Sequence, residues 1–420
     1  MKDDDSATRG RASLKQRSSI VPESSSHSHG TSTAEAGARS LRILIVIDST
    51  RFGGAERQAS ALGLGLRHRH EVHFASLDSQ PGGYLDEILD SGIAFKQFPR
   101  HGRFDPRPIG LLVRYIRDNR IDVIHTFLNM GSLYGLVAAK VTRRPVVCSP
   151  FRDAHPGSRK SEAIKRFIAH HADLSVANSR AGFDCRFEAW TDRFRVVYNG
   201  LDMDRFNLVD EDTADLVVEF SLERFDAIVG MVASLSQKKD HVLLLHVARK
   251  VLGHHPRTGF LIIGDGTERT GLEALALTLG IADNVVFTGY RQDADRFYPL
   301  LDLSILLTDT VHAHEGTPNA VIESMASGIP VIATRCGGTP ETITDGEDGF
   351  LVPAGEVAAT ATVLRRLLDD PPLADRIGTA AAKSARRRFG MDRYIGDCEA
   401  LYREVLGISQ EHSTALDTSS

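Results

Sequence analysis

Cysteine is scarce in this chain. The 420 residues include four cysteines, Cys148, Cys185, Cys336 and Cys398, which lie far apart and form no CxxC pair. Disulfide-stabilised folds and zinc modules both need more closely spaced cysteines than these. The sequence therefore argues against both kinds of protein and favours the reducing environment of the cytoplasm.

Long hydrophobic runs are missing as well. No uninterrupted apolar segment approaches the roughly 18 residues that a membrane-spanning helix requires. The first residues, Met-Lys-Asp-Asp-Asp-Ser, lack the apolar core of a signal peptide. The net charge of -5 is small for 420 residues, which argues against a nucleic-acid partner. We expect a cytoplasmic protein without a transmembrane segment.

The glycine fingerprint GxGxxG of dinucleotide-binding enzymes is absent from both halves of the chain. Gly53-Gly54 follows the first strand-like run but lacks the third glycine and its spacing. Glycine at such a turn still lets a ligand approach the backbone closely. A dehydrogenase is therefore disfavoured, whereas a ligand contact at Gly53 and Gly54 stays open.

What the chain does contain is a regular alternation of strand-like and helix-like segments. The run from Leu41 to Asp48 is almost continuously apolar, as in a strand buried on both faces of a parallel sheet. Further strand-like runs alternate with amphipathic helices, and a second series of the same kind starts at residue 227. This alternation predicts an α/β protein with two doubly wound Rossmann-like domains facing a cleft.

Composition marks the boundaries between these parts. Residues 1–40 are rich in serine, and residues 202–226 are acidic and weakly periodic, as in tails and linkers. The predicted order is a disordered tail at 1–40, an N-terminal Rossmann-like domain at 41–205, a linker at 206–226, a C-terminal Rossmann-like domain at 227–390, a C-terminal helix at 391–407 and a second disordered tail at 408–420.

The most informative stretch is His314-Glu-Gly-Thr-Pro-Asn-Ala-Val-Ile-Glu323, which carries two carboxylates eight positions apart. Thr317 suits a helix N-cap and Pro318 the first helical position, because an N–H group has no helical partner there. The N–H groups from Asn319 onward would then point out of the helix start and form an anion site. Glu323 would lie about 8 Å further along the helix axis.

Glu315 lies just outside this opening. A phosphate site with one acid beside it and another deeper in suits a nucleotide-sugar, which has a reactive sugar at one end and ribose hydroxyls at the other. The alternative is a charge at a helix start with a second glutamate on a solvated face. His312 and His314 beside Glu315 imitate a metal site, but the sequence shows no further ligand for one.

A basic segment lies just before the strand-like run at residues 121–126. Arg114, Arg117 and Arg120 repeat at helical spacing and leave Leu112 and Ile116 to pack on the sheet. These arginines form either a solvated helix face or a surface that attracts an anionic membrane or a phosphate-bearing acceptor.

Taken in this order and spacing, the motifs resemble those of the retaining glycosyltransferases of family 4, which have the two-domain GT-B fold. The resemblance runs from about Leu41 to Gly407. Its most specific parts are Glu315-x7-Glu323, Pro330-Val-Ile-Ala-Thr, Gly337-Gly-Thr-Pro-Glu341 and Asp345-Gly-Glu-Asp-Gly-Phe-Leu-Val. Gly53-Gly-Ala-Glu-Arg, Asn178-Ser, Asn199-Gly-Leu-Asp and Asn284-Val-Val-Phe-Thr-Gly also match.

The resemblance implies transfer of a sugar from a nucleotide-diphosphate sugar, with retained anomeric configuration and no required metal or other cofactor. It implies that Glu315 takes the catalytic-glutamate position, that His125 faces the donor sugar and that Lys239 pairs with the diphosphate. The donor-binding set that follows from it is Gly53, Gly54, Ser234, Lys239, Gly316, Thr317, Pro318, Asn319, Ala320 and Glu323, the last of these on the ribose.

The acceptor side is less defined. Arg152 and Asn178 follow strand-like runs, at the sheet edge where ligands bind, and are the candidate acceptor contacts. Relatives with the Gly-Gly-Ala-Glu-Arg motif often serve surface-polysaccharide or glycolipid assembly. The resemblance thus implies a glycan or lipid-linked acceptor, with peripheral contact to the inner face of the cell membrane as a further option.

Two positions depart from the family pattern. Many relatives have Gly-Arg-Leu where this chain has Ala233-Ser234-Leu235, so an expected phosphate-binding arginine is missing, and Arg335 or Lys238 is the candidate replacement. His125 is followed by Thr-Phe where a second histidine is common. Two other functions therefore stay open. A nucleotide-sugar epimerase would need extra acids in the first domain, and a non-catalytic nucleotide-sugar binder would not need the Glu315/Glu323 pair.

Overall fold

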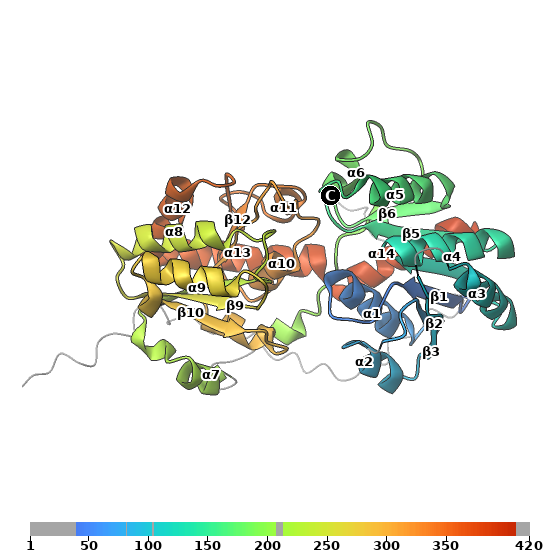
Figure 1. Ribbon diagram of the computed structural model, residues 1–420, viewed down its shortest axis with the longest axis horizontal. Helices are drawn as coiled ribbons and strands as arrows, with labels where there is room; N and C mark the ends of the chain where they lie inside the picture. The colour runs from blue at the N-terminus through green and yellow to red at the C-terminus, as the bar shows by residue number, and fades with distance from the viewer. Residues whose placement is uncertain (1–38, 81, 103–104, 207–212, 409–420) are drawn as a thin grey trace, which may run out of the picture. The chain divides into compact units, whose positions relative to one another are not determined.

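The computed structural model describes residues 39–80, 82–102, 105–206 and 213–408, and the predicted tails at 1–40 and 408–420 lie almost wholly outside them. The described chain divides into two compact units (Figure 1). The N-terminal unit comprises residues 40–152, 156–200 and 391 onward; the C-terminal unit comprises residues 153–155 and 201–390.

The N-terminal unit is built on a seven-stranded sheet with the order β3-β2-β1-β4-β5-β6-β7. All neighbouring strands run parallel. The strands are β1 (Arg42–Ile47), β2 (Glu71–Ser76), β3 (Ala94–Gln97), β4 (Val123–Phe127), β5 (Val146–Phe151), β6 (Leu174–Ala177) and β7 (Phe194–Val196). The strand order reverses between β1 and β4, and in such sheets the crevice beside that point is where ligands bind.

Helices cover both faces of this sheet. They are α1 (Gly54–Leu66), α2 (Leu85–Asp90), α3 (Arg107–Asp118), α4 (Asn129–Thr142), α5 (Arg159–His171), α6 (Arg180–Asp184) and α14 (Met391–Leu406). The central strand shows why its sequence is continuously apolar. Ile43, Ile45 and Ile47 belong to one buried cluster with α1 and α14, whereas Leu44 and Val46 belong to another with α3 and α4.

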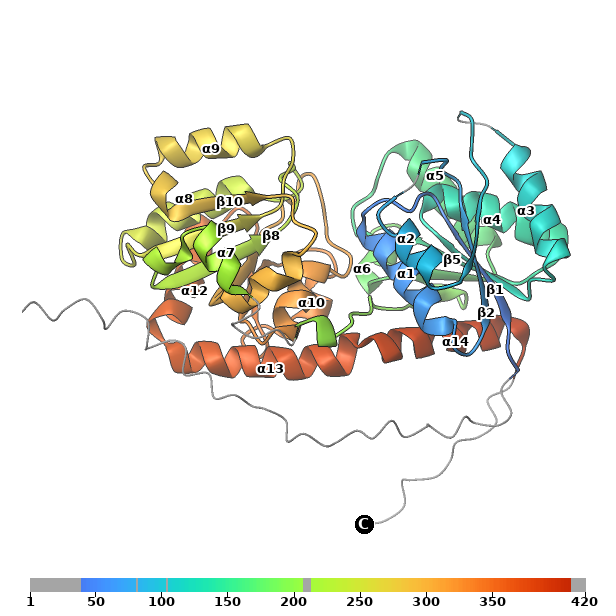
Figure 2. The same ribbon diagram turned by 90° about the horizontal axis from the view of Figure 1, so that it is seen from below.

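The last helix of the chain is part of the N-terminal unit, as Figure 2 shows. Tyr394, Ile395, Cys398, Leu401 and Tyr402 recur at helical spacing and enter the same buried cluster as the strand β1. The predicted C-terminal helix is therefore not a separate element but a layer of the N-terminal fold.

The C-terminal unit has a six-stranded parallel sheet with the order β10-β9-β8-β11-β12-β13. Its strands are β8 (Ala227–Val232), β9 (Thr258–Ile263), β10 (Val285–Gly289), β11 (Leu303–Leu306), β12 (Val331–Thr334) and β13 (Phe350–Val352). Its helices are α7 (Ala214–Glu219), α8 (His241–Leu252), α9 (Arg269–Thr278), α10 (Asn319–Ala326), α11 (Thr339–Thr342), α12 (Val357–Asp369) and α13 (Pro371–Phe389). Two doubly wound parallel sheets confirm the predicted α/β class.

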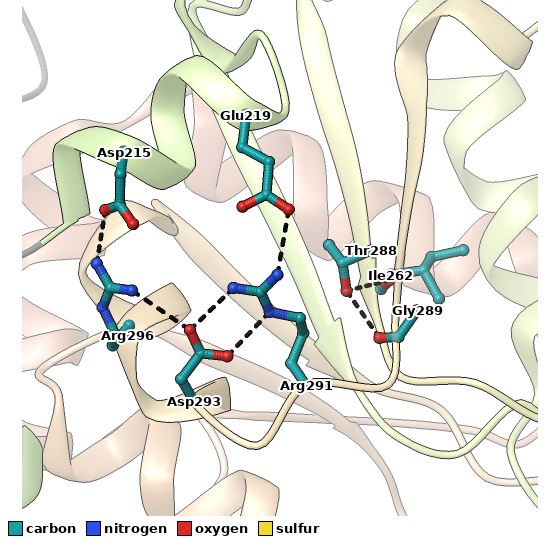
Figure 3. A network of polar contacts seen from close by, with 8 residues as sticks. All are labelled: Asp215, Glu219, Ile262, Thr288, Gly289, Arg291, Asp293 and Arg296. Atoms are coloured by element: carbon teal, nitrogen blue, oxygen red, sulfur yellow. Dashed lines mark hydrogen bonds and ion pairs between the residues drawn. The ribbon is translucent and has the colours of Figure 1, made fainter.

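The segment expected as a linker departs from that prediction over its described part. Residues 213–226 form the helix α7 and a 3-10 turn, and the side chains of Leu216 and Leu222 are fully buried. The acids that suggested a linker instead make ion pairs (Figure 3). Asp215 pairs with Arg296, and Glu219 pairs with Arg291. These contacts attach α7 to the C-terminal unit.

The segment before β11 is a helix of the tighter kind. It is a 3-10 helix from Ala294 to Leu300 with Pro299 inside it. Proline removes an i→i−4 hydrogen bond, which explains why the tighter helix forms here.

Candidate active site

The start of α10 lies one residue later than predicted. Pro318 has φ −76° and ψ 112°, which is extended, so it occupies the N-cap position and Asn319 is the first helical residue. Proline fits both positions because only its φ is fixed. Proline has no side-chain oxygen with which to cap the helix, and the positive end of a helix attracts anions. Gly316, Thr317 and Pro318 are buried, while Asn319 and Ala320 are half-buried.

Glu315 and Lys239 are in contact beside this helix start. The Nζ of Lys239 forms an ion pair with Oε1 of Glu315, and the hydroxyl of Thr308 donates to the same oxygen at 2.9 Å. Both charged side chains are partly exposed, at 20% and 16%. The backbone fixes this arrangement, because Lys239 and Thr308 face each other in an antiparallel bridge.

Two glycines hold the main chain of Glu315. The N–H of Gly338 donates to the carbonyl of Glu315 at 2.8 Å. Gly337 has φ +51°, and a Cβ on it would lie 2.2 Å from that same carbonyl oxygen. Only glycine tolerates both the left-handed backbone and this close approach. The Gly-Gly motif of the sequence therefore positions Glu315.

Glu323 is on α10 and only 7% exposed. Its Oε2 accepts a hydrogen bond of 2.7 Å from the hydroxyl of Tyr298, which is fully buried. The carboxylate is thus held in a fixed position behind the helix start, as a group that orients a polar ligand must be.

Sequence reasoning missed the partners Thr308 and Tyr298. Thr308 lies two residues beyond the end of β11, at the sheet edge where ligands bind, and that position was the available signal. Tyr298 lies in the 3-10 helix before β11, and its pairing with Glu323 depends on tertiary packing alone.

The candidate replacements for the missing arginine are on the same unit. Arg335 follows β12, forms an ion pair with Asp345, and its side chain is 51% exposed. Lys238 and Ser234 are exposed, and the Ser234 hydroxyl lies 3.3 Å from that of Ser236. Arg335 would thus have to leave Asp345 to bind a phosphate.

The histidines near Glu315 have partners of their own. Nδ1 of His312 lies 2.8 Å from Oδ2 of Asp309, and the rings of His314 and His155 meet edge to face. Within the described residues, no group of three or more His, Cys, Asp or Glu side chains is arranged to hold a metal ion.

In the N-terminal unit, Gly53 and Gly54 lie at the start of α1. Gly53 is extended and precedes the helix, and Gly54 is its first residue. A Cβ on Gly53 would lie 2.3 Å from a carboxylate oxygen of Glu56. Burial raises the pKa of Glu56. Glycine at position 53 therefore makes room for this acid.

His125 does not lie where the predicted contact with a donor sugar requires. Its side chain is 1% exposed and stacks on Phe127. Nδ1 lies 2.8 Å from the hydroxyl of Tyr402 and Nε2 lies 2.8 Å from that of Ser149, so both ring nitrogens are engaged. Burial lowers the pKa of His125 to about 3, which keeps the ring neutral. We correct the prediction and assign His125 a structural role.

The two acceptor candidates meet each other at the end of β5. Asn178 is buried, and its amide donates to the carbonyl of Arg152 at 3.4 Å. Arg152 is half-buried, donates to Oδ1 of Asn199 at 2.6 Å, and lies over the ring of Phe127. Asn178 therefore contacts Arg152 and does not face an acceptor. Of the two residues, only Arg152 is partly exposed.

The described part of the chain has no helix that is both long and apolar enough to cross a membrane.

Solved structures with the same architecture are numerous. The chain resembles HepE of Anabaena, crystallised in complex with UDP, with a TM-score of 0.77 and 21% identity over 87% of this chain and 100% of that chain. It also resembles a glycosyltransferase of Rickettsia africae, with a TM-score of 0.79 and 20% identity over 89% of this chain and 100% of that chain. With its two parallel sheets, the chain is an α/β protein of the GT-B fold.

The family follows from the sequence comparisons. Residues 52–205 match the model described as Glycosyltransferase Family 4, and residues 219–384 match the model described as Glycosyl transferases group 1. The chain belongs to the glycosyltransferases of family 4. The prediction of a glycosyltransferase is thereby confirmed, and the epimerase and binder alternatives are not favoured.

Curated relatives agree with this family. The N-acetyl-alpha-D-glucosaminyl L-malate synthase of Bacillus anthracis is 27% identical over 84% of this chain and 94% of its own length. The D-inositol 3-phosphate glycosyltransferase of Streptomyces avermitilis is 35% identical over 54% of this chain and 50% of its own length. The Vi polysaccharide biosynthesis protein VipC/TviE of Salmonella typhi is 25% identical over 74% of this chain and 62% of its own length.

Proposed function

We propose that this glycosyltransferase moves a sugar from a nucleotide-diphosphate sugar to a glycan or lipid-linked acceptor, with retained anomeric configuration and without a required metal. The observation that carries the proposal is the contact of Lys239, Glu315 and Thr308 beside the start of α10. A cation, a carboxylate and an open helix start are the groups that a sugar diphosphate needs within one small volume.

The donor diphosphate binds beside both the positive start of α10 and the Lys239 ammonium group. The helix start of α10 supplies backbone N–H groups, and Lys239 supplies a compact charge. The diphosphate competes with Glu315 for Lys239, which frees the Glu315 carboxylate to accept hydrogen bonds from sugar hydroxyls. Glu323, held by Tyr298, accepts hydrogen bonds from the ribose.

The bond between the sugar C1 and the phosphate oxygen breaks as charge develops on the diphosphate. Fixed positive groups stabilise that charge more in the transition state than in the ground state, which lowers the barrier. The acceptor hydroxyl forms the new bond to C1 on the face that the diphosphate leaves, and its proton passes to a departing phosphate oxygen. The configuration at C1 is therefore retained.

Two findings bear on the choice of donor and acceptor. HepE, which shares the fold, has been crystallised with UDP and with UDP-glucose. The names of the relatives give malate, inositol 3-phosphate and a polysaccharide as the molecules that they glycosylate or build. UDP-sugars are therefore the first donors to test.

Peripheral contact with an anionic membrane is part of the proposal. The helix α3 exposes Arg107, Arg114 and Arg117, Arg120 follows its end, and Leu111 between them is 49% exposed. Cations around an exposed apolar side chain suit a surface of anionic lipids.

A thermal-shift panel tests the donor site. UDP, GDP, ADP and their common sugar conjugates are added to the wild type and to Glu323→Ala, with Glu347→Ala as a matched control at an exposed site of the same unit. One nucleotide should stabilise the wild type, by about 2.7 kcal/mol at a hundredfold excess over Kd. Glu323→Ala should lose this response and Glu347→Ala should keep it. A response that Glu323→Ala keeps would contradict the donor site proposed here.

The nucleotide found in this way is then used in a transfer assay. Glu315→Gln should lose at least about a hundredfold in product formation, because a neutral amide cannot replace the charged acceptor of sugar hydroxyls, yet it should keep the nucleotide response. Proton NMR of the product reads the anomeric configuration. An inverted product would overturn the retaining mechanism, and full activity of Glu315→Gln would overturn the role of Glu315.

A further inference from the structure

The N-terminal unit contains a second site that none of the matched motifs explains. A cavity of about 290 Å³ opens at the carboxyl edge of its sheet. Its lining residues are Asp48, Ser49, Arg51, Leu77, Asp78, Arg100 and Met130. They follow the ends of β1, β2 and β3 or belong to the first turn of α4, so the cavity lies where open parallel sheets bind ligands.

Both acids of the cavity already have partners. Asp78 forms an ion pair with Arg51 at 2.9 Å. Asp48 accepts hydrogen bonds from the backbone N–H groups of Met130, at 3.4 Å, and of Gly131, at the start of α4. Burial raises the pKa of Asp48 to about 6. The charge of Arg100 and the two backbone N–H groups act against this rise, so Asp48 lies within electrostatic range of Arg100.

Arg100 is different. In the part of the chain that the structure describes, its guanidinium makes no hydrogen bond or ion pair. The residue is nevertheless fixed, because its backbone N–H donates to the carbonyl of Leu77 at 3.1 Å, and it is half-buried. A half-buried guanidinium presents a rigid fork of donors that matches a carboxylate or phosphate.

We propose that this cavity binds an oxyanion carried by the acceptor, a carboxylate or a phosphate monoester, and that Arg100 is the residue that holds it. The inference rests on the proposed sugar transfer for the identity of the ligand as the acceptor. It goes further in two respects. It assigns the acceptor a negative charge, and it names Arg100 as the residue that recognises this charge.

The size and lining of the cavity favour a small ligand with hydroxyls beside its anion. The volume lies near the lower end of the roughly 300–1,000 Å³ of small-molecule sites. Ser49 and Asp48 provide hydrogen-bond acceptors next to Arg100. A neutral polyol makes only weak neutral hydrogen bonds to the guanidinium, whereas an oxyanion forms charge-assisted hydrogen bonds with it.

Met130 provides a direct probe, because the chain has six methionines and this one lines the cavity. The full chain, labelled with ¹³C at the methionine methyl groups, is titrated with inorganic phosphate, acetate and myo-inositol. Phosphate or acetate should shift the Met130 signal saturably. Met231, buried in β8 of the C-terminal unit, is the internal reference and should not move.

Arg100→Gln should weaken the binding of the anion at least about tenfold, as expected when one charge-assisted contact is lost. Arg166→Gln, which removes an exposed arginine from α5 of the same unit, should not change it. Comparing glycerol 3-phosphate with lactate then shows which of the two oxyanions is preferred.

Three outcomes would overturn the proposal. They are no saturable shift of Met130 with any anion, equal shifts in Arg100→Gln and the wild type, or a shift with myo-inositol as strong as that with phosphate. The nucleotide response in the thermal-shift panel is read on the same variants. It reports on the C-terminal unit, so a wild type that binds no anion but keeps its nucleotide response contradicts this inference alone.

Discussion

His125 shows how a residue with a catalytic signature can serve the core. Its ring fills the space between Phe127, Ser149 and Tyr402 and satisfies both of their hydroxyl groups. Because its pKa lies near 3 in the fold and near 6.5 in an ordinary setting, the unfolded chain takes up a proton first as the pH falls. The contribution of His125 to stability is therefore full above about pH 6.5 and is lost progressively toward pH 3.

His125→Phe should keep the volume of the ring but remove its titration. We expect the variant to be less stable than the wild type by about 1–3 kcal/mol at pH 7.5, because two buried hydroxyls lose a partner. The pH dependence of its unfolding free energy between pH 3 and 6.5 should be weaker, as measured by urea titration. His171→Ala, at an exposed site, should change neither quantity. A folded His125→Phe without transfer activity would restore the predicted contact with the donor.

The sequence placed His125 at the right strand but could not decide which way it faces. Its partner Tyr402 lies 277 positions away, on a helix that only tertiary packing brings to the sheet. Glu315 was predictable because the Glu315-x7-Glu323 motif and the helix start after it are visible in the sequence. The sequence did not single out Arg100, because only the three-dimensional structure shows that its guanidinium makes no hydrogen bond or ion pair with the described residues.

Among the elements, the turn that carries Gly337 and Gly338 matters most for the site. It connects β12 to the short helix α11, and the N–H of Gly338 donates to the carbonyl of Glu315. The boundaries of such turns follow from glycine spacing in the sequence. Glycine spacing does not show which other loop such a turn supports, because the turn and the Glu315 loop are separated by a helix and a strand.

Gly337→Ala should push the Glu315 carbonyl away, since the new Cβ would overlap it at 2.2 Å. We expect a loss of about 1–3 kcal/mol in stability and at least about tenfold lower transfer activity, because small displacements of a reacting group are costly. Gly346→Ala is the matched control. It also has a positive φ, +78°, but nothing lies within 4 Å of its Cβ. It should therefore cost about 1 kcal/mol of backbone strain without reducing activity.

Equal losses of activity in both variants would mean that backbone strain, and not the contact with Glu315, is responsible. Urea unfolding and initial transfer rates on the two purified variants distinguish these cases.

At the scale of the whole molecule, substitution of the arginines around α3 tests the proposed contact with a membrane. Replacing Arg114, Arg117 and Arg120 together by glutamine removes three charges, each contributing about 1 kcal/mol near an anionic surface. Flotation with phosphatidylglycerol vesicles should therefore show about a hundredfold weaker binding. Vesicles of phosphatidylcholine should bind neither protein.

A second triple variant controls for net charge. Arg249, Lys250 and Lys383 are exposed cations of the C-terminal unit, and replacing them by glutamine changes the total charge by the same amount. This variant should bind anionic vesicles like the wild type. If both triple variants lose binding equally, the attraction is a property of net charge and not of α3.

The place of α14 in the N-terminal unit has a consequence for the order in which the protein is made. Residues 40–200 leave the ribosome early, but Tyr394 and Tyr402, which fill one side of their core, are synthesised last. The C-terminal unit, complete at residue 390, has all its strands before that moment. Domains usually fold in the order of synthesis. Here the core of the first unit to emerge is completed only when its last helix has been synthesised.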